Sequence, residues 1–172
     1  MRQLGVARSF QRTNILKTVS VLENVRLAAQ AITLSGWTLL GSGGRQSAHL
    51  ESARAALDRV GLGWAETKPA GVLSHGAQRQ LEIAIALAGQ PKVLLLDEPL
   101  AGMGQEEGER MATLLKSLAK DHAVLLIEHD MDFVFRVADW MTVMVEGAVL
   151  AEGRPAQVRK SAEVQKAYLG VS

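Results

Sequence analysis

The residues best suited to chemistry are two adjacent acids, Asp97 and Glu98, which directly follow an apolar run over 93–96 and precede Pro99. Such a run predicts a buried parallel strand, and parallel sheets bind ligands at the carboxyl ends of their strands. Because neighbouring strand residues face opposite sides, the two acids cannot share one role. One could help to hold Mg²⁺ and the other could activate a water that attacks a phosphate. The alternative is a pair of loop acids that caps the next helix.

Two further patterns carry polar groups that could meet a phosphate. Ser74 is a suitable N-cap for a helix predicted over about 76–88, and Gly76 allows close approach to its first turn. The free N–H groups and the dipole of such a helix form an anion site, although an ordinary capped helix has the same local features. His129 follows a second predicted strand, which would bring it to the same sheet edge as Asp97. A structural, hydrogen-bonding histidine is the alternative there.

The elements that must position these residues follow from hydrophobic periodicity. Strands alternating with helices of 10–15 residues indicate an α/β parallel sheet, preceded by a mostly helical segment. The pattern predicts a strand-like stretch over 4–10, helices over about 20–40, 47–60, 76–88, 106–120 and 130–138, a glycine hinge over 41–44, strands over 92–98 and 123–128, a hairpin over 140–151 and a helical tail from Pro155.

Composition narrows the class of protein. The chain has 172 residues, 48% of them hydrophobic and 22% charged, which is typical of a globular domain and unlike a disordered chain. Its formal net charge of +1 gives no electrostatic reason to expect nucleic acid as a partner. The absence of cysteine excludes disulfides and thiolate-bound zinc. The longest apolar stretches, such as 83–88, are far shorter than the ~20 residues of a membrane-spanning helix. The start lacks the apolar core of a signal peptide, so the expected location is the cytoplasm.

Taken together, LSHGAQRQLEIA, VLLLDEP and IEHD, in this order and spacing, resemble the nucleotide-binding domain of ABC transporters. They correspond to the signature motif, the Walker B strand with its glutamate, and the switch histidine. SFQ at residues 9–11 resembles the Q-loop, and 100–103 lie where the D-loop falls. The segments ARSFQ, VLENV and DEPLAGM are most similar to those of the ATP-binding subunits of branched-chain amino-acid importers. The corresponding subunits of urea importers have much the same segments.

The resemblance implies roles for matching residues. Glu98 would be the general base, and Asp97 would help to hold Mg²⁺ through water. His129 would contact the γ-phosphate of ATP, and Gln11 would sense Mg²⁺ and the attacking water, so that Gln11 counts as both a catalytic and a metal-site residue. The signature would bind nucleotide held by another subunit, through Ser74 and Gly76, with Gln78 also among the cofactor-binding residues.

The expected fold is therefore an incomplete P-loop NTPase-like, ABC-type α/β parallel sheet with a helical subdomain. The whole chain, 1–172, would be a single partial nucleotide-binding domain. Its parts would be a helical subdomain over about 12–90, a sheet core over about 91–153 and a helical tail over 154–172.

The sequence departs from the family in one major respect. No lysine follows a glycine, so the phosphate-binding P-loop, GxxxxGK followed by Ser or Thr, is not among the 172 residues. Residues 41–47 are no substitute, because they contain no lysine and join two helices. Ala77 replaces a residue that is usually polar in these importers. We expect an ATPase subunit in a form shortened at its N-terminus and inactive alone; a non-catalytic interaction module is the alternative. A DNA-repair or chromosome ABC ATPase would need a coiled-coil insertion before the signature, and the segment has no sustained heptads.

The resemblance also implies partners. These are a second ATP-binding subunit, identical or different, and integral membrane permease subunits, with no nucleic acid. The chain would lie in the cytoplasm, peripherally on the inner face of the cell membrane. The segment from Gln11 to about Leu40 would dock on the permease through side chains including Leu16, Val19, Val21 and Leu22, although Leu22 and Val25 could instead fill the helical core.

Overall fold

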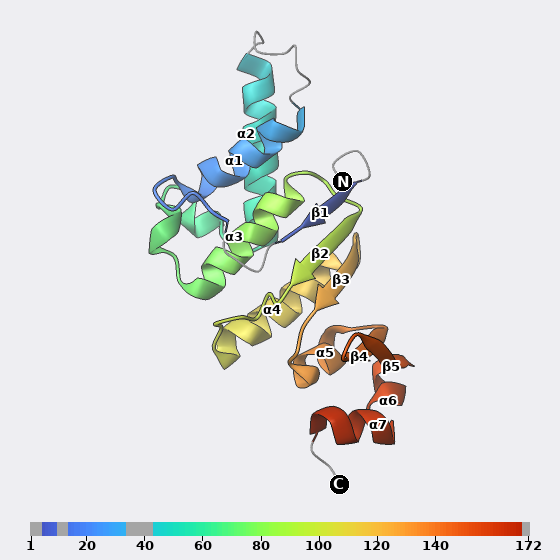
Figure 1. Cartoon of the computed structure of the whole chain (residues 1–172). Coiled ribbons are helices and arrows are strands. Elements are labelled where there is room, and N and C mark those ends of the chain that lie inside the picture. The colour runs from blue at the N-terminus through green and yellow to red at the C-terminus, as the bar shows by residue number, and fades with distance from the viewer. Residues whose placement is uncertain (1–4, 10–13, 34–42, 170–172) are drawn as a thin grey trace. The chain divides into compact units, whose positions relative to one another are not determined.

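The computed structural model describes residues 5–9, 14–33 and 43–169, and the chain divides into two compact units, Met1–Ile127 and Glu128–Ser172. In the first unit, a group of helices adjoins a small sheet (Figure 1). Its elements are β1 (Val6–Arg8), α1 (Val21–Thr33), α2 (Gly43–Arg59), the 3-10 turns η2 (Gly63–Ala65) and η3 (Ala70–Val72), α3 (His75–Leu87), β2 (Val93–Asp97), α4 (Gln105–Leu118) and β3 (Ala123–Ile127).

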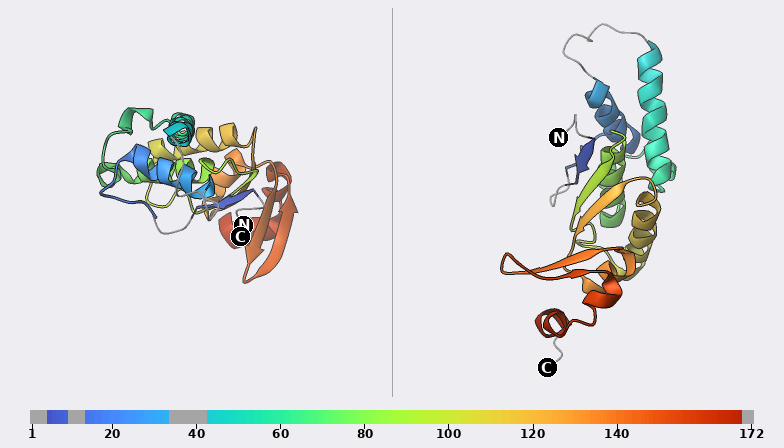
Figure 2. Two further views of the ribbon diagram at one scale, coloured as in Figure 1. Left: turned by 90° about the horizontal axis from the view of Figure 1, so that it is seen from above. Right: turned by 90° about the vertical axis from the view of Figure 1, so that its right-hand side faces the viewer.

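The sheet of the first unit has the order β1-β2-β3, and both pairings are parallel, as the sequence predicts. The register places Val93 opposite Ala123 at one end and Asp97 opposite Ile127 at the other. Leu94 and Leu96 are both buried, and because alternate strand residues share a side they lie on the same face of β2. Burial of these side chains, worth about 1.5–3 kcal/mol each, fixes which face of β2 is turned to the core. The ribbon views show α4 running beside the sheet (Figure 2).

The opposite face of the sheet is apolar and exposed. Leu125 and Ile127 of β3 each expose 57% of their surface, and Leu95 of β2 lies beside Leu125 in the register. An apolar sheet face with a strand at its edge is the kind of surface through which chains self-associate.

The helices α1, α2 and α3 form the helical core. Val21 and Val25 of α1, Leu57 of α2 and Leu81 of α3 are all fully buried. The start of α1 is capped by Ser20, whose Oγ accepts a hydrogen bond from the Glu23 N–H at 3.1 Å. A hydrogen bond from Arg26 lowers the pKa of Glu23 below its ordinary value, although burial opposes the shift. That small stabilisation is present above the ordinary glutamate pKa and is lost as the pH falls through the lowered one.

Within α3, the buried ion pair of Arg79 and Glu82 is connected to Asn14 by a hydrogen bond. Arg79 Nη1 donates to Glu82 Oε2 at 2.8 Å, and both side chains are less than 10% exposed. The other carboxylate oxygen of Glu82 accepts the backbone N–H of Asn14 at 2.8 Å. Before residues 10–13, the Ser9 N–H donates to the Leu95 carbonyl of β2 at 2.9 Å. Ser9 and Asn14, the described residues on either side of 10–13, are therefore both anchored by hydrogen bonds.

The second unit has its own small core. Its elements are α5 (Met131–Val137), the antiparallel hairpin β4 (Met141–Val145) and β5 (Ala148–Gly153), α6 (Pro155–Val158), α7 (Ala162–Val164) and the π-helical turn η4 (Gln165–Leu169). Met141, Val143, Val158 and Val164 are buried together. Positive φ angles at Glu146 and Gly147, 49° and 80°, make the tight turn between the strands.

Most predicted elements are confirmed to within a few residues. The prediction of a glycine hinge over 41–44 is wrong in part. Gly43 and Gly44 open α2 instead of forming a loop, and Gly41 lies outside the described residues. Two glycines cost a helix about 1 kcal/mol each, which the burial of Ala53, Ala56 and Leu57 further along α2 offsets. The predicted helix over 20–40 is described as far as Thr33.

We predict that Glu82→Ala destabilises the first unit by about 3–5 kcal/mol, because it leaves the buried Arg79 guanidinium without its carboxylate and frees the Asn14 N–H. Glu51→Ala, at an exposed position of α2, is the matched control and should change stability by less than about 0.5 kcal/mol. Urea unfolding followed by circular dichroism measures both. Equal midpoints for the two variants would show that the ion pair contributes no net stability.

We also predict that the exposed face of β3 drives self-association of the chain. The double substitution Leu125→Lys and Ile127→Lys should lower the weight-average mass measured by sedimentation equilibrium at a given concentration. It should not lower the melting temperature, since both side chains are already exposed. Val72→Lys, at a position 70% exposed outside the sheet, is the control and should leave the mass unchanged. A monomeric wild-type chain at all concentrations would contradict this prediction.

Candidate functional site

The carboxyl edge of the sheet carries the two predicted acids. β2 ends at Asp97 and β3 ends at Ile127, directly opposite in the register. The Glu98 N–H donates to the Ile127 carbonyl at 2.9 Å, which ties the turn after β2 to the end of β3. Asp97 and Glu98 are thus held at the edge where parallel sheets bind ligands.

Asp97 forms hydrogen bonds with two neighbours: Arg8, the last residue of β1, and Ser9, which follows β1. Arg8 Nη2 donates to Asp97 Oδ2 at 3.3 Å, and the Asp97 N–H donates to Ser9 Oγ at 3.3 Å. The Asp97 side chain is 22% exposed, so it is accessible but restrained. Parallel pairing of β1 with β2 is what brings residues so distant in the sequence together.

Glu98 departs from the strand geometry that the sequence argument assumed. Its φ of 45° lies in the left-handed region, which residues other than glycine seldom adopt. The strand ends at Asp97, so strand alternation does not set the direction of the Glu98 side chain; the sharp turn does. Such backbone strain costs about 1–3 kcal/mol and persists where the surroundings enforce it, here through the hydrogen bond to β3.

The donor set at this edge suits a particular kind of metal site. In the described part of the chain, no cluster of three or more histidine, aspartate and glutamate side chains could hold a metal alone. Mg²⁺ is commonly bound through one or two carboxylates together with water and substrate phosphates. Asp97, as a single accessible carboxylate, fits an ion of that kind.

The start of α3 has the predicted cap. Ser74 Oγ accepts the Ala77 N–H at 3.2 Å, and the Gln78 N–H donates to the Ser74 carbonyl at 2.9 Å. The Gln78 side chain turns back and donates from Nε2 to the Leu73 carbonyl at 3.0 Å. The cap leaves the Ser74 hydroxyl hydrogen available for a further acceptor.

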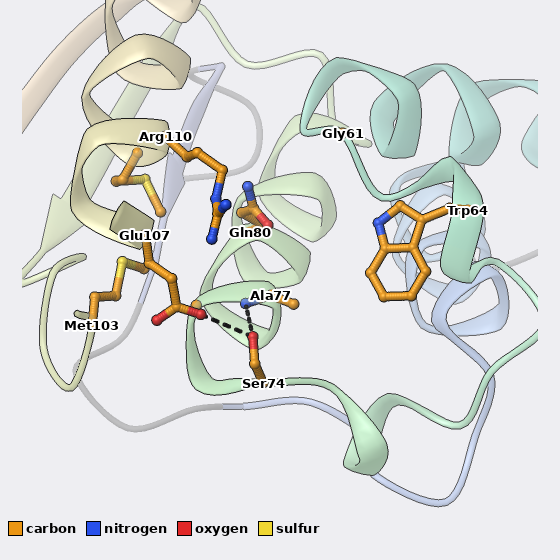
Figure 3. Close-up of a pocket in the computed structure, with 10 residues that line it drawn as sticks. Gly61, Trp64, Ser74, Ala77, Gln80, Met103, Glu107 and Arg110 are labelled. Carbon is orange, nitrogen blue, oxygen red and sulfur yellow. Dashed lines mark hydrogen bonds between the residues drawn. The ribbon is translucent and has the colours of Figure 1, made fainter. Parts of the chain in front are cut away.

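That further acceptor is Glu107 of α4, which sequence reasoning did not single out. Ser74 Oγ donates to Glu107 Oε1 at 3.0 Å, and Figure 3 shows the carboxylate pointing at the start of α3. The two residues line a pocket of about 310 Å³ that also includes Trp64 and Arg110. Local sequence gives no signal for this contact, because it depends on how α4 packs beside α3.

The structure does not test whether two predicted site residues, Gln11 and His129, reach this edge. Gln11 lies outside the described residues, although its flanks, Ser9 and Asn14, are anchored. His129 belongs to the second unit, where its side chain is 78% exposed and its Nδ1 lies 3.8 Å from Glu128 Oε2. Their roles stay predictions.

The predicted docking surface needs one correction. Val21 is fully buried in the helical core and cannot contact a permease, because α2 and α3 pack over that side of α1. Leu16 is 52% exposed and remains available. In the described part of the chain, no helix combines the length and the apolar character that crossing a membrane requires.

Solved structures share this fold. The ADP conformation of MJ1267, an ATP-binding cassette of an ABC transporter, superposes with a TM-score of 0.79 at 28% identity over 99% of this chain and 70% of that one. cbiO1 from Clostridium perfringens, part of the ABC transporter complex cbiONQ, gives a TM-score of 0.78 at 27% identity over 95% of this chain and 62% of that one.

Sequence comparisons indicate the same family as the solved structures. A profile of the ABC transporter family matches residues 2–101, and a profile of branched-chain amino acid ATP-binding cassette transporters matches 148–172. The high-affinity branched-chain amino acid transport ATP-binding proteins BraF of Pseudomonas aeruginosa and LivG of Escherichia coli are each 39% identical. Those alignments cover 96% and 98% of this chain, and 68% and 69% of the relatives. The chain therefore belongs to the ABC transporter family, among its ATP-binding ATPase subunits.

Proposed function

We propose that the chain is an ATP-binding subunit of an importer for branched-chain amino acids. The observation that carries the proposal is the pairing of an accessible acid edge, Asp97 and Glu98, with a serine-capped helix start at Ser74 in one unit. The similarity to BraF and LivG supports the choice of solute.

In this proposal the acid edge and the start of α3 serve two different nucleotides. Asp97 contributes a carboxylate to Mg²⁺, which when bound with ATP would neutralise charge on the phosphates. Glu98 would accept the proton of the attacking water, and its backbone is fixed to the end of β3 by a hydrogen bond. Ser74 and Gly76 bind the γ-phosphate of ATP carried by a second subunit, with Gln78 holding the helix start.

Gln11 and His129 complete the proposed machinery. Gln11 would sense the metal and the attacking water; the described residues on its two sides, Ser9 and Asn14, are each hydrogen-bonded. His129 contacts the γ-phosphate, for which its exposed imidazole is accessible.

The partners follow from the same proposal. The subunit pairs with a second ATP-binding subunit and is held by permease subunits at the inner face of the cell membrane. Exposed Leu16, with the half-buried Val19 and Leu22 nearby, would contact the permease. The 172 residues contain no GxxxxGK motif, so in this proposal they do not themselves supply the phosphate cradle.

A polypeptide of the 172 residues should therefore bind Mg-ATP with a dissociation constant weaker than about 1 mM, which corresponds to less than ~4 kcal/mol of binding free energy. The backbone N–H groups and lysine of a P-loop supply most of the phosphate contacts in this family, and they are not in the sequence. Isothermal calorimetry measures the affinity. Micromolar binding would show that another part of the chain cradles the phosphates.

Glu98→Gln in the assembled importer should lower ATP turnover by at least ~10²-fold while nucleotide binding survives, because glutamine keeps the shape of glutamate and lacks its basic oxygen. Single-turnover hydrolysis measures the rate, and Glu106→Gln, an exposed acid on α4, is the control expected to retain it. Near wild-type hydrolysis by Glu98→Gln would mean that the base lies elsewhere. An assembled wild-type complex without ATPase activity would favour the non-catalytic interaction module instead.

A further inference from the structure

The Glu107 carboxylate lies where the start of α3 would meet a phosphate. Its Oε1 accepts the Ser74 hydroxyl at 3.0 Å. A methyl group built on Gly76 would come within 2.6 Å of Glu107 Cδ and Oε1, so the carboxylate packs directly against that glycine. One acidic group of the same chain thus covers both residues through which the signature would bind nucleotide.

The position of Glu107 has a clear electrostatic reason. It lies in the first turn of α4, whose N-terminal N–H groups favour an anion, and its side chain reaches across to the N-terminal end of α3 (Figure 3). The positive ends of two helices therefore act on one carboxylate. Its neighbour Glu106 pairs instead with Arg110, at 2.7 Å, and does not contact Ser74.

The hydrogen-bonding capacity of Ser74 makes this contact exclusive. Its Oγ already accepts the Ala77 N–H, and its single hydrogen is donated to Glu107. A γ-phosphate oxygen would require that same hydrogen. It would also bring negative charge to within a few ångströms of the carboxylate, where like charges repel. Glu107 and a phosphate cannot both occupy this place.

We propose that Glu107 is a competing, positioning residue of the signature: it holds the Ser74 hydroxyl in the resting subunit and must be displaced by the γ-phosphate of ATP bound to a second subunit. This inference rests on the proposed function, since it assumes that the start of α3 receives nucleotide. It adds that the affinity of the assembled site for ATP is lowered by a carboxylate of the same chain.

The test is steady-state ATPase activity of the assembled importer as a function of ATP concentration, with Glu107→Gln. Glutamine keeps the size of the side chain but removes its charge and is a weaker acceptor than a carboxylate. We expect the half-saturating ATP concentration to fall about three- to ten-fold, with kcat changed by less than about two-fold. Glu106→Gln, the adjacent acid, should leave the half-saturating concentration unchanged.

A second measurement checks the contact in the chain itself. Ser74→Ala and Glu107→Gln, alone and combined, should shift the unfolding midpoint non-additively, because the first removes the donor and the second weakens the acceptor of the same hydrogen bond. Additive shifts would overturn the proposal, since Glu107 would then not hold Ser74.

The kinetic result separates the two ideas. If the wild-type complex hydrolyses ATP and Glu107→Gln raises the half-saturating concentration, leaves it unchanged or lowers kcat alone, competition by Glu107 is wrong while the proposed function stands. If the wild-type complex does not hydrolyse ATP, the proposed function is wrong and the competition falls with it.

Discussion

Parallel pairing of β2 with its two neighbours is the constraint on which the acid site depends. Each strand is short, but the shared direction brings all the carboxyl ends to one edge, so that Arg8, Asp97 and Ile127 meet although they lie far apart in the sequence. The backbone bond from Glu98 to β3 then forces the chain into a left-handed turn immediately after Asp97. The strain of that turn is maintained by the sheet, and this is how a packed core can hold a reactive edge in place.

A second constraint is the packing of α4 beside the start of α3. Helix N-termini attract anions, and a capped helix start left open would bind any available one. Here Glu107 fills that role from within the chain, and a Cβ atom at position 76 would force its carboxylate to shift. The absence of a side chain at Gly76 is what lets the carboxylate lie so close to the start of α3. In the structure, this carboxylate of the same chain occupies the helix start.

The buried Arg79–Glu82 pair connects these sites to the helical core. An ion pair removed from water is costly, and it is retained only where both groups are well bonded. Glu82 uses its second oxygen on Asn14, beyond the Q-loop, while Ser9 is fixed to β2 on the other side. Residues 9 and 14 are therefore each fixed to a different part of the first unit, Ser9 to the sheet and Asn14 to α3.

The sequence alone was sufficient for the order of helices and strands, for the capping role of Ser74 and for the acids at the end of a buried strand, because periodicity and caps are local properties. It also carried the family resemblance, since the motifs are contiguous. It could not reveal the Glu107–Ser74 contact, the Arg8–Asp97 pair or the left-handed turn at Glu98. Each of these joins elements, or depends on a hydrogen bond to a distant strand, and so arises only when the sheet and α3 and α4 pack together.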